Sequence, residues 1–223
     1  MYSLTTPIGE IATAQPSSTG VFLRHRLDFC CGGRRSLQDS CERAGLNPTE
    51  ILAELEADAR KGGDTLHWED RSQTELADHI EGHYHAGLRR DFPPLIEAAR
   101  KVERVHASKP GVPAGLADVL SDFFTEMQSH MGKEETILFP MIRRGAQGDA
   151  VYMPVRVMEG EHDSHREQLE KIRALTDDLR APAHACATWN ALYHGLTTIE
   201  TDLMHHIHLE NNILFARATQ RAG

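Results

Sequence analysis

The strongest constraint on the fold is a ten-residue pattern that occurs twice in the chain. The first copy runs from His130 to Phe139 and the second from His206 to Phe215. Each copy begins with His, has Glu four residues later and ends in Ile-Leu-Phe. Residues four apart lie on one face of an α-helix, so each copy predicts an imidazole and a carboxylate that can share a metal ion. One such pair is common by chance, whereas two copies with the same apolar ending indicate a site.

The rest of the chain also has the pattern of helices rather than of strands. Ala, Leu, Glu and Arg dominate its periodic stretches, and long apolar–polar alternation is absent. Ser72 and Glu75 form a capping box that opens a long helix, which we expect to be interrupted at Pro93-Pro94. The long helices expected after residue 64 cover about residues 72–106, 114–144, 153–179 and 186 to the end. Four long helices with short connections predict an up-down-up-down four-helix bundle.

A small helical domain is expected before the bundle. Ser36 can cap one of its helices, and the segment Asn-Pro-Thr-Glu at 47–50 predicts the start of another. The Gly-Gly pair at 62–63 is the best candidate for a domain boundary. We therefore expect an all-α protein, with a small helical N-terminal domain at residues 1–63 and the bundle at residues 64–223.

Charge and composition argue against several classes of protein. The formal net charge is −9, which disfavours a nucleic-acid partner held through its phosphates. The sequence has no apolar run near about 18 residues and no basic start followed by an apolar stretch, so we expect neither a membrane span nor a secretory signal. Four cysteines in 223 residues do not suggest a disulfide framework, and a reducing cytoplasm fits best. The 14 histidines are unusual and need an explanation.

The spacing of four histidines predicts that they lie at one level of the bundle. In antiparallel helices, two residues lie at equal height when the turn between them is midway along the sequence. For successive pairs of His85, His130, His162 and His206, the midpoints are 107.5, 146 and 184. The helix breakers at or beside these midpoints are Ala107–Pro113, Gly145–Gly148 and Ala181-Pro182. One layer of the bundle should therefore receive the four imidazoles and the two repeat carboxylates.

These six groups have the chemistry of a non-haem di-iron site. Two carboxylates on facing helices can each bridge two ions while imidazoles fill the terminal positions. Nitrogen and oxygen ligands without thiolate suit iron or manganese, and zinc is an alternative that two bridging carboxylates disfavour. Six protein ligands leave room for an oxo or hydroxo bridge and a diatomic ligand. The predicted metal ligands are His85, His130, Glu134, His162, His206 and Glu210.

Other charged and aromatic residues near the motifs have different interpretations. His106 lies 21 residues after His85, about 30 Å along a continuous helix, so we expect a structural role at the end of the bundle. His205 and His208 point off the ligand face, and we expect both to be exposed. Glu161 has two open interpretations, either a partner that orients an imidazole or a solvated carboxylate.

Cys30 and Cys31 form the second candidate site. Neighbouring cysteines can form only a strained disulfide, which is easily reduced. At a helix end before a Gly-Gly pair they would be accessible for a redox step or as a relay for iron. The alternative is two small apolar residues in a packed turn, and spacing alone does not separate the two interpretations.

Together these motifs resemble a known family. The segment Asp28–Gly33 resembles the cysteine motif of the repair of iron centres (RIC) proteins, also called iron–sulfur cluster repair di-iron proteins. The segments that resemble their hemerythrin-like domain are Lys101–His106, Ser129–Glu135, Ile137–Met141, Val157–Asp163 and His206–Asn212. The resemblance covers nearly the whole chain. A small departure is Ala216, where the family usually has Pro, but this position lies beyond the ligand turn.

The resemblance implies a cytoplasmic bacterial protein made under nitrosative or oxidative stress. Such a protein restores damaged iron–sulfur clusters by donating iron from its di-iron centre, so its partners would be iron–sulfur proteins with damaged clusters. The resemblance assigns the bridging role to Glu134 and Glu210. It assigns the terminal positions to His85, His130, His162 and His206.

Three functional classes stay open at this point. The first is an iron donor for cluster repair, and the second is an enzyme that reduces nitric oxide at the two irons. The third is a module that senses or stores a diatomic gas such as nitric oxide or oxygen. The cysteine-bearing N-terminal domain argues against the third, because a simple gas carrier needs no such domain. The sequence does not separate the first two.

Overall fold

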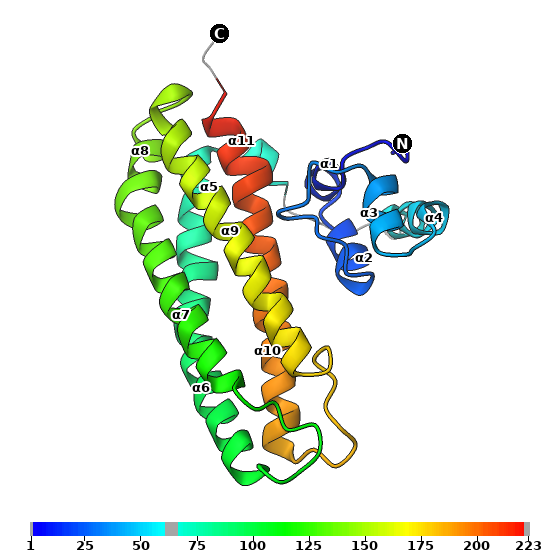
Figure 1. Cartoon of the computed structure of the whole chain (residues 1–223). Helices are drawn as coiled ribbons and strands as arrows, with labels where there is room; N and C mark the ends of the chain where they lie inside the picture. The colour runs from blue at the N-terminus through cyan, green and yellow to red at the C-terminus, as the bar shows by residue number, and fades with distance from the viewer. Residues whose placement is uncertain (1, 61–66, 221–223) are drawn as a thin grey trace. The chain divides into compact units, whose positions relative to one another are not determined.

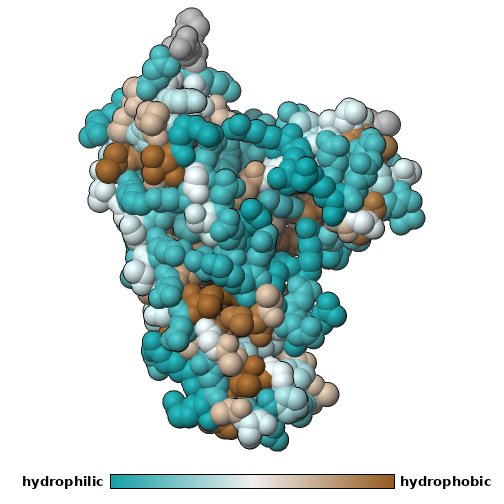
Figure 2. Space-filling model, in the orientation of Figure 1, coloured by the Kyte–Doolittle hydropathy of each residue, from teal (hydrophilic) through white to brown (hydrophobic). Residues whose placement is uncertain are grey.

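The computed structural model describes residues 2–60 and 67–220, and these residues form helices joined by turns (Figure 1). An isolated bridge between Pro7 and Ser36 is the β-like pairing in this part of the chain. None of its helices is both long and apolar enough to cross a membrane. On the face drawn in Figure 2, hydrophilic residues dominate and hydrophobic ones form small patches. Most large apolar side chains are instead buried.

The chain divides into two compact units. The first consists of Met1–Asp78, Ile142–Val155 and Met204–Gly223. The second consists of His79–Met141 and Arg156–Leu203.

The N-terminal part of the first unit contains four helices. They are α1 (Ile8–Ala14), α2 (Ser18–Arg24), α3 (Leu37–Arg43) and α4 (Pro48–Ala59). As predicted, Ser36 caps α3, since its Oγ accepts a hydrogen bond from the backbone N–H of Asp39 at 3.0 Å. Asn47 caps α4 in the same way, with the N–H of Thr49 as donor at 3.0 Å. The Gly62-Gly63 pair, at which we predicted the domain boundary, lies outside the described residues.

An apolar core holds these short helices together. Phe22 and Phe29 are fully buried and stack with their ring centroids 5.8 Å apart. The side chains around them include Ile8, Ile11, Val21, Leu27, Leu37, Cys41, Ile51 and Leu55. Each such buried side chain contributes about 1.5–3 kcal/mol. Helices this short depend on that packing, because isolated helices of fewer than about 12 residues are marginal in water.

The rest of the first unit consists mainly of helical segments. They come from α5 (Gln73–His79), α8 (Phe139–Arg143), α9 (Asp149–Leu175), α10 (Ala187–His208) and α11 (Phe215–Ala218). The capping box at the start of α5 is confirmed. The Oγ of Ser72 accepts from the N–H of Glu75 at 3.1 Å, and the N–H of Ser72 donates to the Glu75 carboxylate at 2.9 Å.

The second unit is a four-helix bundle. Its helices are α6 (Ala86–Val105), α7 (Leu116–Lys133) and the parts of α9 and α10 that belong to this unit, which run side by side in Figure 1. Phe92 of α6 and Phe123 of α7 are fully buried and meet edge to face, with centroids 5.6 Å apart. The predicted all-α class, with a small helical N-terminal region followed by a bundle, is confirmed.

Two predicted helix features were wrong. Pro93 and Pro94 do not interrupt α6, which continues through both residues. Both prolines are exposed, and the buried side chains of Phe92 and Ile96 on the same helix hold it against the bundle. Helix α9 runs from Asp149 to Leu175, so it begins and ends four residues earlier than expected, and it contains Pro154.

Three short stretches of π-helix interrupt the regular α-helices in the described part of the chain. They are η2 (Ile80–His85), η3 (Glu134–Leu138) and η4 (Leu209–Leu214). Each contains a predicted metal ligand, namely His85, Glu134 and Glu210. Single-turn π-helices are rare and occur frequently at functional sites. The helix pattern of the sequence did not predict them.

Candidate metal centre

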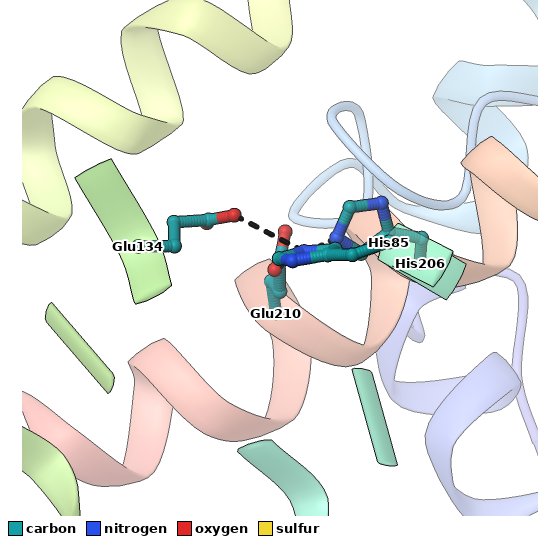
Figure 3. Close-up of side chains that lie close together, drawn as sticks. All are labelled: His85, Glu134, His206 and Glu210. Carbon is teal, nitrogen blue, oxygen red and sulfur yellow. Dashed lines mark hydrogen bonds and ion pairs between the residues drawn. The ribbon is translucent and has the colours of Figure 1, made fainter. Parts of the chain in front are cut away.

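Two groups of four side chains each bring one ligand atom per residue within 4.8 Å of one another. The first group is His85, Glu134, His206 and Glu210, and its carboxylates and imidazoles converge in Figure 3. The second group is His130, Glu134, His162 and Glu210. All six predicted ligands are therefore brought together. Both groups contain the same two carboxylates, whereas each has its own pair of imidazoles.

The six side chains are shielded from water. Five of them are 0 % exposed, and His130 is 1 % exposed. Burying two carboxylates close together is costly unless positive charge offsets their repulsion and lost hydration. The donor set therefore fits a cation, and the combination of imidazole nitrogen with carboxylate oxygen fits iron, manganese or zinc.

A carboxylate outside the six orients His85. The Nδ1 of His85 lies 2.8 Å from Glu135, and Arg89 donates two hydrogen bonds to the same carboxylate at 2.7 and 2.9 Å. Burial acts to raise the pKa of Glu135, but the hydrogen bonds from Arg89 and His85 outweigh it and the pKa is lowered. An ionised carboxylate accepts the proton on Nδ1, which leaves the lone pair on Nε2. That nitrogen faces inward, 3.4 Å from Glu134.

His130 of α7 has the same arrangement, with a carboxylate of α9 as its partner. Its Nδ1 lies 2.9 Å from Glu161, which also forms an ion pair with Lys133. The hydrogen bond from His130 lowers the pKa of Glu161 to about 2, with Lys133 assisting and burial opposing. The Nε2 of His130 then lies 3.1 Å from the Nε2 of His162 and 3.4 Å from Glu134. Of the two interpretations of Glu161, the structure supports orientation of an imidazole, and that imidazole is His130.

Two residues at this centre were missed from the sequence. Glu135 directly follows a ligand, and a residue one position further along a helix points in a different direction, so the helical pattern did not place it at the site. His165 is 2 % exposed and packs its ring against those of His130 and His162, with centroids 4.7 and 6.0 Å away. Its position three residues after His162, on nearly the same helix face, was the available signal.

The apolar ending of the first repeat covers part of the centre. The ring of Phe139 stacks on His85 with centroids 5.7 Å apart.

The histidines that were not predicted to be metal ligands have different surroundings. His106 belongs to neither group; its Nε2 lies 3.2 Å from the sulfur of Cys186 and its ring lies beside Trp189. His208 was expected to be exposed, and this was wrong, since it is 4 % exposed. Its ring packs edge-on against Phe29, and burial lowers its pKa to about 4. His205 is partly buried against the same phenylalanine.

Cys30 and Cys31 lie in a third group of possible metal ligands, together with Asp28. Neither cysteine forms a disulfide; Cys30 is buried and Cys31 is partly exposed. The carbonyl oxygen of Cys30 accepts hydrogen bonds from Asn211 at 3.4 Å and Asn212 at 3.2 Å.

Comparisons with known proteins agree with this site. Residues 76–218 match the hemerythrin HHE cation binding domain, and residues 4–59 match a domain of unknown function, DUF542. The iron–sulfur cluster repair protein YtfE of Cronobacter sakazakii is 46 % identical over 212 residues, which is 95 % of each chain. The proteins of that name from Yersinia pseudotuberculosis serotype IB and Yersinia pestis strain Pestoides F are each 44 % identical over 211 residues, again 95 % of each chain. The chain therefore belongs to the hemerythrin HHE family and, within it, to the family of iron–sulfur cluster repair proteins.

Proposed function

We propose that the six buried ligands hold two non-haem iron ions. Glu134 and Glu210 would bridge the ions, and a bridging oxide or hydroxide would complete the pair. His85 and His206 would be terminal ligands of one ion, and the other two histidines of the second. The observation that carries this proposal is that both carboxylates belong to both groups of ligand atoms.

The same site supports iron donation as the function. Ferrous iron stands low in the affinity order of divalent metals, and a site without thiolate holds it less tightly than one with thiolate. Such a site can release iron to a stronger acceptor. We propose that the protein restores iron–sulfur clusters damaged by nitrosative or oxidative stress, with its iron as the cargo. Its clients would be cytoplasmic iron–sulfur proteins, and nitric oxide and oxygen would be small ligands of the iron.

The side chains around the ions have defined roles in this proposal. Glu135 and Glu161 keep the Nε2 lone pairs of His85 and His130 directed inward. The bound iron would be the metal that is donated. Until it is released, its positive charge would offset the negative charge of the two buried carboxylates. Phe139 limits the access of water to His85.

Iron transfer is the experiment that tests this function. The iron-loaded protein is incubated with an apo iron–sulfur protein under anaerobic conditions, and cluster formation is measured alongside nitric oxide consumption. We expect clusters to form at a rate that depends on the loaded protein, and Glu134→Leu to abolish this transfer. His106→Ala is the matched control, because that histidine belongs to neither ligand group, and it should leave iron content and transfer near normal.

Two results would contradict the proposal. Catalytic consumption of nitric oxide without iron transfer would favour the reductase. Loss of iron in His106→Ala comparable to that in His130→Ala would show that His106 reaches the metal.

A further inference from the structure

Asp28, Cys30 and Cys31 converge in the segment between α2 and α3. The sulfur of Cys30 lies 3.2 Å from Oδ1 of Asp28 and 3.8 Å from the sulfur of Cys31. One ligand atom from each of the three residues lies within 4.8 Å of the others. This cluster is separate from the six ligands of the bundle.

These separations match those of ligands on a single ion. With metal–sulfur bonds of about 2.3 Å and a tetrahedral angle, two thiolates on one ion lie about 3.8 Å apart. A thiolate and a carboxylate oxygen bound at about 2.0 Å would lie about 3.5 Å apart. The observed sulfur–sulfur separation equals the first value, and the 3.2 Å sulfur–oxygen separation requires only a narrower angle. At 3.8 Å the two sulfur atoms are also too far apart for a disulfide bond.

The backbone holds this arrangement in place. Oδ1 of Asp28 accepts a hydrogen bond from the N–H of Cys31 at 2.9 Å, which closes the turn. Gly32 is required next, because a Cβ there would meet the carbonyl oxygen of Asp28 at 2.7 Å. Asn212 donates to the carbonyl oxygens of Phe29 and Cys30, each at 3.2 Å. The carbonyls are thus engaged, and the two thiols and the carboxylate are directed to one another.

When the two thiols and the carboxylate are all ionised, they need a cation that offsets their mutual repulsion. The hydrogen bond with Cys31 and burial, together with the nearby Asp28 carboxylate, raise the pKa of the Cys30 thiol well above its usual range. Without a cation, Cys30 therefore remains a thiol. When a divalent cation binds, each coordinating thiol releases its proton to solvent, and the metal charge replaces the repulsion among the three groups with attraction.

We propose that Asp28, Cys30 and Cys31 form a second metal site, with three protein ligands and one exchangeable position, for a borderline-soft divalent cation. Three protein ligands with an open fourth position are typical of sites that exchange a ligand, whereas closed structural sites use four. The identification of the physiological ion as ferrous iron rests on the proposed function. Asn211, which donates to the carbonyl of Cys30, directly follows Glu210 in the chain. The site would accept iron released from the bundle and present it to a client through the open position.

Cadmium is the probe for this site, because thiolate-to-cadmium charge-transfer absorption reports only sulfur ligands. The full-length protein is titrated with Cd²⁺ under anaerobic conditions in a Cys186→Ser background, since Cys186 lies 3.2 Å from His106 and could itself bind the ion. None of the six bundle ligands contains sulfur, so they add no such band. We expect a saturable band of about one Cd²⁺ per chain, accompanied by proton release.

Two variants separate binding from folding. Cys30→Ser with Cys31→Ser should lose the band. Asp28→Asn keeps an Oδ1 acceptor for the N–H of Cys31 but removes the charge, so it should preserve the thermal unfolding temperature and weaken Cd²⁺ binding by at least about tenfold. Asp39→Asn, an exposed carboxylate in α3, is the control and should bind as the parent does.

The outcomes are independent of the proposed iron donation. A missing band in the parent, a band that survives the double serine change, or Cd²⁺ binding by Asp28→Asn within twofold of the parent would overturn the second site. In each case the iron content of the bundle and its transfer activity would still test the proposed function separately. Conversely, the predicted band in a protein that transfers no iron would support the site and contradict iron donation.

Discussion

Glu161→Gln isolates the contribution of an orienting carboxylate to metal binding. Gln has nearly the same size and keeps an oxygen that can accept the hydrogen bond from Nδ1 of His130, but it removes the negative charge. Lys133 loses its ion-pair partner in the same change. His130 then becomes a weaker electron donor to a metal at Nε2, while the packing stays nearly unchanged.

The pKa of Glu161 sets an upper limit on the effect. That pKa is about 2 against an ordinary value of 4.5, which corresponds to about 3 kcal/mol of interaction with its partners. His130 and Lys133 share this interaction, and water screens part of it because the side chain is 28 % exposed. A share of about 1.5 kcal/mol for His130 predicts roughly tenfold weaker metal binding, at the lower end of the 10–100-fold range typical of such changes.

Competition with a ferrous chelator measures this effect directly. Glu170→Gln is the matched control, since Glu170 lies on the same helix α9, is 63 % exposed and forms only a surface pair with Arg166. We expect Glu161→Gln to lose iron to the chelator at roughly tenfold lower chelator concentration than Glu170→Gln. Equal iron retention by the two variants would refute the orienting role of Glu161.

Two further predictions concern the stability of the N-terminal region. Gly33→Ala should lower the free energy of unfolding by about 1–3 kcal/mol, because its Cβ would meet Oδ1 of Asn212 at 2.6 Å. Gly160→Ala should not lower it, because that Cβ would meet nothing within 4 Å beyond the adjacent backbone of its own helix. Calorimetry compares the two variants. The pKa of Glu54 is lowered below 4.5, first by its hydrogen bond to Arg24, so its contribution to stability is present above that pH and is lost as pH falls through the lowered value. Thermal unfolding of wild type and Glu54→Gln should therefore differ at neutral pH and converge in acid, and a constant difference across the range would contradict the assignment.

Much of the site could be predicted because it depends on regular helix geometry. The i, i+4 spacing places His130 with Glu134, and His206 with Glu210, on shared helix faces. The turns that lie midway between successive ligand histidines then place these histidines at one level of the bundle. These relations need only the helical repeat and the positions of helix breakers, both of which are visible in the sequence.

The features that were missed depend on tertiary contacts. The π-helical turns at the ligands depart locally from the α-helical repeat, and no residue type in the sequence indicates where they occur. Pro93 and Pro94 remain helical because the neighbouring Phe92 is held in the bundle core, which outweighs local preference. His208 is buried because Phe29, 179 residues earlier in the chain, packs against it. The sequence marks Asp28 only as part of the Asp28–Gly33 motif, and its proximity to the thiols follows from a hydrogen-bonded turn.

The sharing of two carboxylates by two ions is the central claim, and Mössbauer spectroscopy of the ⁵⁷Fe-loaded protein, with the iron content measured on the same sample, tests it most directly. We predict about two irons per chain that are magnetically coupled, and loss of most of the iron in Glu210→Leu because one bridge is removed. One iron per chain, two uncoupled irons, or an unchanged spectrum in Glu210→Leu would contradict the shared-carboxylate site.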